Sequence, residues 1–196
     1  MSNSHIVRAD TLPEGLAEQT AALLVDSFYS MFKCISKDRE TLRRLFIPCM
    51  QLDLFHVLLR GGQIAGVIAV SDVGRRAILI KKTTCVSIFG PAKGKMIAWQ
   101  LYKILSVPAV KGPRDGYIDF IATAPEFKRC GVATELFCHV ESQLAFDRMY
   151  LDVLAANHPA ICLYEKLGYR TETVKKNVLM RLAGIKAMNI MKKELK

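Results

Sequence analysis

One stretch of the chain places a strand, a turn, a helix and a second strand in an order that restricts the fold. The strand-like segment Tyr117–Thr123 leads into the turn Ala124–Thr134. A helical apolar pattern follows over Thr134–Met149, and a second strand-like segment covers Tyr150–Val153. Two strands joined through a helix of this length pair in parallel by a right-handed crossover. The sequence therefore predicts a parallel strand pair.

The turn between the first strand and the helix is basic and contains glycine. It reads Ala-Pro-Glu-Phe-Lys-Arg-Cys-Gly-Val-Ala-Thr and stands where the helix begins. Backbone N–H groups at a helix start have no partner within the helix, and the helix dipole favours negative charge there. With Lys128 and Arg129 beside them, these donors predict an anion site suited to phosphate. The turn thus favours a phosphate-bearing ligand, and with it an enzyme.

Length and composition indicate one globular domain over residues 1–196. A hydrophobic content of 51% with 23% charged residues is typical of a folded chain and not of a disordered one. No apolar run approaches the ~20 residues that a membrane crossing needs, and the first residues lack the apolar core of a signal peptide. We therefore expect a cytoplasmic protein without a membrane partner.

Charge and cysteine usage narrow the classes of partner. The net charge is +10, but Lys and Arg form only short clusters, such as Arg43-Arg44, and no nucleic-acid-binding motif. A basic surface that attracts anionic ligands is the preferred interpretation, and no nucleic-acid partner is expected. The six cysteines form neither a CxxC pair nor a zinc-ligand spacing. We therefore expect no metal, and we expect Cys130 to contribute backbone and not a nucleophile.

Patterns elsewhere in the chain alternate between helical and strand-like spacing. The expected helices are Pro13–Phe32, Ser36–Phe46, Ala160–Leu167 and a short one near Asn177–Leu182; the expected strands are His5–Arg8, Phe55–Arg60, Gln63–Ser71, Tyr169–Val174 and Ile185–Lys192, with Ala77–Ile80 as an extension of the sheet. The hairpin around Gly61-Gly62 and the late strands imply antiparallel pairing. The predicted fold is an α/β (α+β) domain with a mixed sheet and helices on both faces.

The segment Lys82–Gly116 lacks clear strand signals and contains one helical stretch, Lys95–Leu105. Five apolar side chains are predicted to share one broad face of this helix, with Trp99 and Tyr102 at its margin; the five are Met96, Ile97, Leu101, Ile104 and Leu105. A packing helix is the first interpretation. A lid or wall of a substrate pocket is the second, because long insertions near active sites often have that role.

Two parts of the chain resemble the signatures of the GNAT N-acetyltransferase superfamily. The first is the strand with the turn Pro-Glu-Phe-Lys-Arg-Cys-Gly-Val-Ala and the helix after it. The second is Leu151-Asp-Val-Leu-Ala-Ala-Asn-His-Pro-Ala-Ile-Cys-Leu-Tyr-Glu-Lys-Leu-Gly-Tyr169. The resemblance covers nearly the whole chain and implies a mostly antiparallel sheet with one parallel pair splayed around an acyl-CoA site. Lys128 stands where the family usually has Arg or Gln, whereas Gly131 and Ala133 fit its pattern.

The resemblance also implies which residues would hold acetyl-CoA, the expected cosubstrate. The backbone of one strand segment would pair with the pantetheine arm, as a strand edge pairs with an extended peptide, and the turn would bind the pyrophosphate. The implied binding residues are Ile121, Ala122, Thr123, Lys128, Arg129, Cys130, Gly131, Val132, Ala133, Thr134 and Asn157. Asn157 also fits a helix N-cap, and Gly168 fits a helix terminator.

Three residues are implied as catalytic. Tyr164 matches a family tyrosine that protonates the departing thiolate, and a phenol with a pKa near ~10 starts protonated; a buried structural tyrosine is the alternative. Asp119 and Asp152 match positions at which family members place a base. Apolar neighbours would raise the pKa of either carboxyl group if it were buried, and Asp119 is slightly favoured. A water path or a purely structural carboxylate remains an alternative for both.

The predicted function is transfer of an acetyl group from acetyl-CoA to a primary amine, directly and in a ternary complex. The alternative is a non-catalytic CoA-binding or sensor module, which would keep the turn but need neither Tyr164 nor an aspartate. A small molecule, a peptide N-terminus and a lysine side chain all stay open as the acceptor. A homodimer is equally open.

Overall fold

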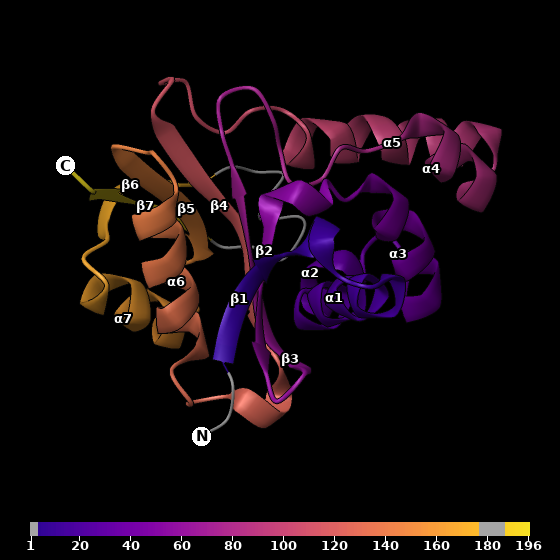
Figure 1. The fold of residues 1–196 in the computed structure, drawn as a ribbon. Helices are drawn as coiled ribbons and strands as arrows, with labels where there is room; N and C mark the ends of the chain where they lie inside the picture. The colour runs from indigo at the N-terminus through magenta and orange to yellow at the C-terminus, as the bar shows by residue number, and fades with distance from the viewer. Residues whose placement is uncertain (1–3, 177–186) are drawn as a thin grey trace.

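A computed structural model describes residues 4–176 and 187–196 (Figure 1). In this part of the chain the strands form one sheet in the order β1-β2-β3-β4-β5-β7-β6. Their bounds are β1 Ser4–Arg8, β2 Phe55–Arg60, β3 Gln63–Ser71, β4 Asp115–Thr123, β5 Arg148–Leu154, β6 Arg170–Lys175 and β7 Met188–Glu194. The helices are α1 Glu14–Ser27, α2 Tyr29–Phe32, α3 Arg39–Phe46, α4 Lys82–Phe89, α5 Pro91–Leu105, α6 Val132–Gln143 and α7 His158–Lys166.

The sheet confirms the predicted fold class. β4 and β5 pair in parallel from Asp115↔Arg148 to Ile118↔Leu151, and every other pair of neighbouring described strands is antiparallel. Because this pairing stops at Ile118, the remaining halves of β4 and β5 splay apart. The splay leaves the second half of β4 without a partner strand on that side.

Helices cover both faces of the sheet (Figure 1). The first hydrophobic cluster packs α1, α2 and α3 on one face and is built around residues such as Leu24, Leu42 and Phe46. The second packs α6 and α7 on the other, around residues such as Phe137 and Tyr169. β3 lies between the two clusters and is buried along nearly its whole length, as is typical of a strand with both faces covered.

Two predicted helices end or break earlier than expected. The helix predicted over Thr134–Met149 ends at Gln143, and Leu144 is already extended with φ −95° and ψ 136°. Leu144 and Phe146 still pack on the second cluster and Met149 is buried in β5, so their apolar spacing imitates a longer helix. The helix predicted over Pro13–Phe32 is interrupted at Phe28, whose ring packs edge-on against Phe120 of β4 with centroids 5.2 Å apart.

Other boundaries shift for identifiable reasons. The helix predicted from Ser36 begins at Arg39, because the Asp38 carboxylate caps it by accepting from the N–H groups of Glu40 and Thr41. Ala77–Ile80 is not a strand: it forms one isolated bridge, between Ile78 and Met50. The predicted helix at Asn177–Leu182 and the first two residues of the strand Ile185–Lys192 lie outside the described residues.

The segment after β3 contains a helix that the sequence did not predict. α4 and α5 form a helical hairpin, and α5 begins at Pro91, earlier than predicted. A Cβ on Gly94 would lie 2.5 Å from the Cys85 carbonyl oxygen, so this glycine allows the two helices to approach closely. The predicted face of α5 was partly wrong, since Ile97, Ala98 and Leu101 are buried but Met96 and Ile104 are exposed. No helix in the described ranges is long and apolar enough to span a bilayer.

Candidate active site

The splay between β4 and β5 opens a cleft of about 340 Å³. Its walls come from both strands, from the junction of α1 and α2, from the end of α5 and from α7. The side chains that line the cleft include Phe28, Met31, Arg76, Ile104, Tyr117, Asp119, Asp152, Asn157 and Tyr164. The three predicted catalytic residues and Asn157 are therefore brought together in one space.

The basic turn has the geometry of an anion site. After the 3-10 turn Pro125–Phe127, the chain reaches Gly131, which has φ +78° and directly precedes the first helical residue, Val132. The first helical N–H with a partner is that of Glu135, which donates to the Gly131 carbonyl oxygen. No described side chain caps the helix, so the N–H groups of Val132, Ala133 and Thr134 remain available to a ligand. Lys128 and Arg129 are exposed beside them.

Arg60 holds this turn in place and was missed by the sequence analysis. It lies at the end of β2, donates to the Cys130 carbonyl oxygen at 3.1 Å and pairs with Glu135 on α6. Seventy positions separate it from Cys130, and no local pattern signals such a contact. Arg129 has φ +65°, an uncommon conformation outside glycine. Arg60 thus fixes the turn from outside it, through the Cys130 carbonyl oxygen.

The strand segment next to the turn presents a free edge. Ile121, Ala122 and Thr123 pair with Ile68, Val67 and Gly66 of β3. On the other side, no described strand pairs with β4 beyond Ile118. An edge with unpaired backbone groups can hydrogen-bond an extended ligand that carries amides. This edge is the one that the resemblance assigns to the pantetheine arm.

Tyr164 stands on α7 and is almost fully buried, with 8% of its surface exposed. Its ring packs against those of Phe137 and Tyr169, with centroids 5.5 and 6.4 Å away. Burial raises the pKa of Tyr164 to about 12, so the phenol stays protonated over the neutral range. Asn157 caps the same helix, since its side-chain oxygen accepts from Ala160 N–H at 3.4 Å. Gly168, with φ +93°, follows the end of that helix.

Asp119 is held in a closed network. Its side chain is 1% exposed and forms an ion pair with Arg76 at 2.5 Å. The other carboxylate oxygen accepts from the Ser71 hydroxyl and from Ala77 N–H. Asp119 is also the extra residue of a β-bulge, because Ala69 pairs with Phe120 while Val70 pairs with Ile118. Both oxygens of the Asp119 carboxylate are thus already engaged by groups of the protein.

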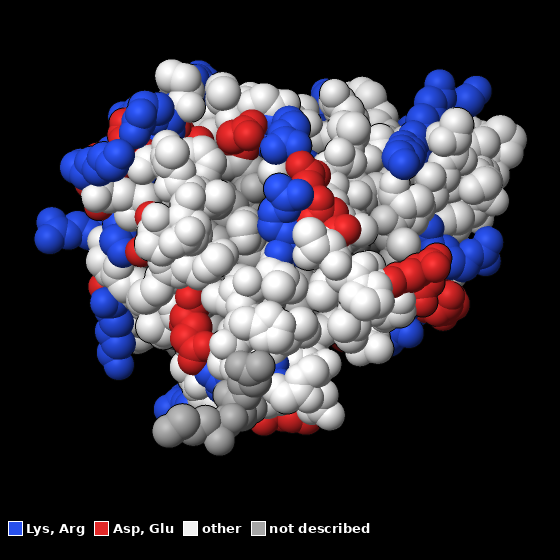
Figure 2. Space-filling view, in the orientation of Figure 1, with Lys and Arg blue, Asp and Glu red and all other residues white. Residues whose placement is uncertain are grey.

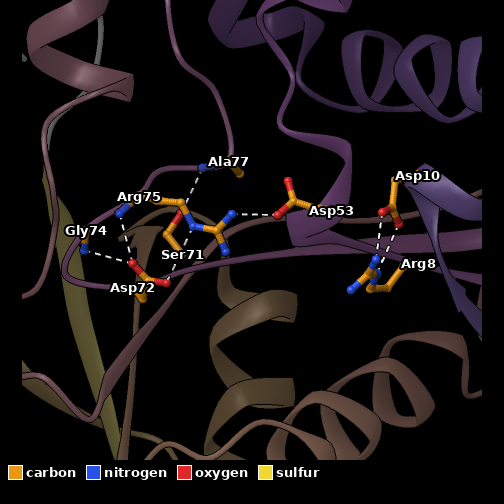
Figure 3. Close-up of polar contacts among 8 residues, drawn as sticks. All are labelled: Arg8, Asp10, Asp53, Ser71, Asp72, Gly74, Arg75 and Ala77. Carbon is orange, nitrogen blue, oxygen red and sulfur yellow. Dashed lines mark hydrogen bonds and ion pairs between the residues drawn. The ribbon is translucent and has the colours of Figure 1, made fainter.

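Arg76 follows a tight turn at the end of β3, and Figure 3 shows the turn residues Asp72, Gly74 and Arg75. The Asp72 carboxylate accepts from the N–H groups of Gly74 and Arg75, at 2.7 and 2.9 Å, as in an Asx turn. The Arg75 guanidinium is directed away to Asp53, at 2.6 Å. Arg75 and Arg76 are adjacent in the sequence but pair with different aspartates, Asp53 and Asp119. Arg76 also donates to the Val107 carbonyl oxygen at 2.6 Å, which ties the cleft to the end of α5.

Asp152, on β5, differs from Asp119 in its environment. Its side chain is 18% exposed, with Lys175 Nζ at 3.8 Å from one oxygen. The other oxygen is buried without a hydrogen-bond partner among the described residues. Burial raises the pKa of Asp152, although Lys175 and a hydrogen bond with Tyr117 act in the opposite direction. Asp152 is therefore a carboxylate that lines the cleft and has one buried oxygen without a described hydrogen-bond partner.

Tyr117 is the second residue that the sequence analysis did not single out. Burial, together with the carboxylates of Asp152 and Asp119, raises the pKa of this phenol far above its usual range. The Arg76 guanidinium lies 5.1 Å from its ring centroid. Tyr117 and Asp119 are two residues apart on β4. Because residues at this spacing share a face of a strand, the sequence could have placed Tyr117 beside Asp119. Among the described residues, no group of three or more His, Cys, Asp or Glu side chains is placed to hold a metal ion.

With this geometry in view, comparison with known proteins gives a family. The profile of the acetyltransferase (GNAT) family matches residues 20–169. The chain belongs to this family. The match contains the turn, the β4 edge and Tyr164, the parts from which the resemblance was first inferred.

Individual relatives agree with the assignment over shorter stretches. An N-alpha-acetyltransferase of Saccharolobus solfataricus is 33% identical over 84 residues, which is 41% of this chain and 49% of that protein. The Cysteine-rich protein 2-binding protein of Mus musculus is 39% identical over 66 residues, 34% of this chain and 8% of that protein. The chain thus spans half or less of the length of these curated relatives.

Solved structures share the fold. An N-acetyltransferase from Staphylococcus aureus Mu50 superposes with a TM-score of 0.62 at 15% identity, covering 96% of this chain and 99% of that one. A Bacillus subtilis acetyltransferase in complex with CoA has a TM-score of 0.56 at 14% identity, with 100% of both chains covered. At such identities the likeness concerns the fold alone.

Proposed function

We propose that this protein is an N-acetyltransferase that moves the acetyl group of acetyl-CoA to a primary amine by direct transfer in a ternary complex. The observation that carries the proposal is the β4–β5 splay. One end of it offers the anion-binding turn at the start of α6, and the cleft that it opens holds a carboxylate with a free oxygen and a buried phenol. A phosphate-bearing thioester and an amine therefore have separate sites that meet at the splay.

The residues present fit acetyl-CoA. The N–H groups of Val132 to Thr134 and the cations Lys128 and Arg129 would hold the pyrophosphate. The free edge of Ile121, Ala122 and Thr123 would hold the pantetheine amides and direct an N–H group at the thioester carbonyl, where negative charge develops. Asn157 contributes by fixing the start of α7, which carries Tyr164.

Asp152 is the base in this proposal. An ammonium group must lose a proton before its nitrogen can attack, and a carboxylate with a raised pKa and an oxygen without a described hydrogen-bond partner can accept that proton, directly or through water. Asp119 is the weaker choice, because Arg76, Ser71 and Ala77 already occupy its oxygens. We assign Asp119 the role of holding Arg76, and with it the turn after β3, against the cleft.

Tyr164 is the acid. As the amine nitrogen bonds to the carbonyl carbon, the carbon–sulfur bond breaks and its electron pair leaves with sulfur. Tyr164 gives its proton to that sulfur, and the resulting phenolate takes up the second proton that the nitrogen loses as the amide forms. Asp152 holds the first proton, taken from the ammonium group, until it passes to solvent, so the products are an amide and a free thiol. Proximity of both substrates supplies much of the rate enhancement.

The test is release of free CoA thiol from acetyl-CoA in the presence of an amine panel that includes peptides, with CoA affinity measured in parallel. We expect thiol release that depends on the amine and is lost in Asp152→Asn. If the protein binds CoA but thiol release is no faster than uncatalysed hydrolysis for every amine, the sensor module is supported instead. Failure to bind CoA at all would remove the basis of both.

A further inference from the structure

The positive charge of this protein is concentrated in one segment. Positions 73–114 carry nine of the 28 Lys and Arg residues and none of the 18 Asp and Glu residues, so the rest of the chain is nearly balanced. This segment contains α4 and α5, which project from one end of the molecule (Figure 1). Figure 2 shows blue side chains and uncharged surface, without red, over the outer part of this hairpin.

The basic side chains of the segment fall into two groups. Its three arginines are neutralised by aspartates elsewhere in the fold: Arg75 by Asp53, Arg76 by Asp119 and Arg114 by Asp147. Its lysines form no ion pair with any described residue and are exposed; they are Lys81, Lys82, Lys93, Lys95, Lys103 and Lys111. These six charges therefore remain available to an anionic partner.

The outward face of α5 adds large apolar side chains to this charge. Trp99 is 61% exposed, Met96 54% and Ile104 66%. Lys103 Nζ lies 3.9 Å from the Trp99 ring centroid, within range of a cation–π contact. Exposed aromatic and methionine side chains gathered on one face are typical of interaction sites. We call Met96, Trp99, Lys103 and Ile104 the α5 face.

The α5 face is continuous with the cleft between β4 and β5, because Ile104 belongs to both. A molecule that enters the cleft past Ile104 therefore passes along α5. The 15 residues of this helix span about 22 Å, the length of about seven residues of extended chain. A polypeptide carries a primary amine, carboxylates and apolar side chains at such spacing, all within one molecule.

We infer that the acceptor is a polypeptide with Asp and Glu residues within about seven positions of the reacting amine, and that it docks on the α5 face. This inference rests on the proposed function and specifies its substrate class. Carboxylates of the acceptor pair with Lys95 and Lys103, and an apolar side chain packs on Trp99. The docking contacts lie outside the reacting centre, so they act mainly through KM.

The test compares two ten-residue peptides with the same first three residues, followed by Asp and Glu in one and by Asn and Gln in the other. With a few exposed charge pairs of up to about 1 kcal/mol each, we expect kcat/KM to be about tenfold higher for the acidic peptide at low salt. The advantage should shrink as salt is added. The double variant Lys95→Glu/Lys103→Glu should lose it, whereas the variant Trp99→Ala should lower kcat/KM for both peptides. The matched control Lys166→Glu, on α7, should retain it.

The outcomes separate the two proposals. Equal kcat/KM for both peptides in an active wild type, or an advantage that survives Lys95→Glu/Lys103→Glu, overturns the inference and leaves the acetyltransferase intact. Trp99 is the one tryptophan of the chain, so its fluorescence reports binding without catalysis. If the acidic peptide changes the Trp99 fluorescence but no thiol is released, the result counts against the proposed function alone. Anionic vesicles or RNA that displace the acidic peptide and bind more tightly would replace the polypeptide as the partner.

Discussion

The two ends of the proposed site are built in different ways. The donor end uses backbone groups from one continuous stretch, the β4 edge and the turn up to Thr134, and its key atoms are N–H groups at the start of α6. The acceptor end uses side chains from separate parts of the chain, among them Phe28, Arg76, Ile104 and Asp152. A backbone site accepts one invariant ligand part, whereas a side-chain site can be altered residue by residue. The difference suits an enzyme with a fixed donor and a particular acceptor.

Asp152→Asn should have the largest effect, and it tests the acceptor end. An amide cannot take the amine proton, so we expect kcat to fall by about 10²–10³ while CoA affinity stays unchanged. In the wild type, activity should fall as pH drops through the raised pKa of Asp152, because the protonated carboxyl is no base. The variant should lack this acidic limb. An unchanged kcat–pH profile in Asp152→Asn would exclude it as the base.

Asp119→Asn should affect stability more than chemistry. It leaves the buried Arg76 without its counter-charge, and breaking a buried pair typically costs about 3–5 kcal/mol of folding free energy. We expect a large drop in the denaturation midpoint, with kcat per folded molecule within about tenfold of the wild type, since Asp119 only positions Arg76. A well-folded Asp119→Asn variant with kcat as low as that of Asp152→Asn would make Asp119 the base.

Local and remote contacts explain which parts were predictable. The turn, the β4 edge and Tyr164 were identified because each lies within a contiguous pattern. Arg76 and Tyr117 escaped notice, because their roles depend on the turn after β3 and on the β4–β5 register. The bulge at Asp119 arises from cross-strand pairing, which a single strand does not reveal.

The same contrast between local patterns and remote contacts explains which parts of the fold were predicted correctly. The hairpin of β2 and β3 was located correctly from its Gly-Gly turn and apolar runs. The end of α6 was not, because Leu144, Phe146 and Met149 keep contacting the core after the helix has ended. Apolar spacing reports which residues are buried, and it reports the backbone conformation only indirectly. α4 was missed for a related reason, since its eight residues include one that is buried, Cys85.

Gly131→Val tests the donor end. A β-branched residue at φ +78° is strained, and its side chain would keep phosphate from the backbone donors. We expect CoA affinity to fall by about a hundredfold, or about 2.7 kcal/mol. Gly62→Val is the matched control, because Gly62 has the same φ of +78° with open space around it but lies in the β2–β3 hairpin. Equal losses of CoA affinity in both variants would mean that the effect is backbone strain alone.

Tyr164→Phe should give the smallest of these effects and shows how the two ends meet. Removing the phenol takes away a proton donor to sulfur, which water can partly replace, so we expect kcat to fall by about tenfold, with CoA affinity kept. Tyr169→Phe is the control, since its ring lies in the same aromatic cluster but its hydroxyl donates to Glu141 at 3.0 Å, away from the cleft. It should cost about 1 kcal/mol of stability and leave kcat unchanged. Because burial raises the pKa of Tyr164 to about 12, the wild type should keep this donor protonated up to about pH 10. A basic limb below pH 10 that disappears in Tyr164→Phe would contradict this environment, and equal kcat in both tyrosine variants would remove Tyr164 from the mechanism.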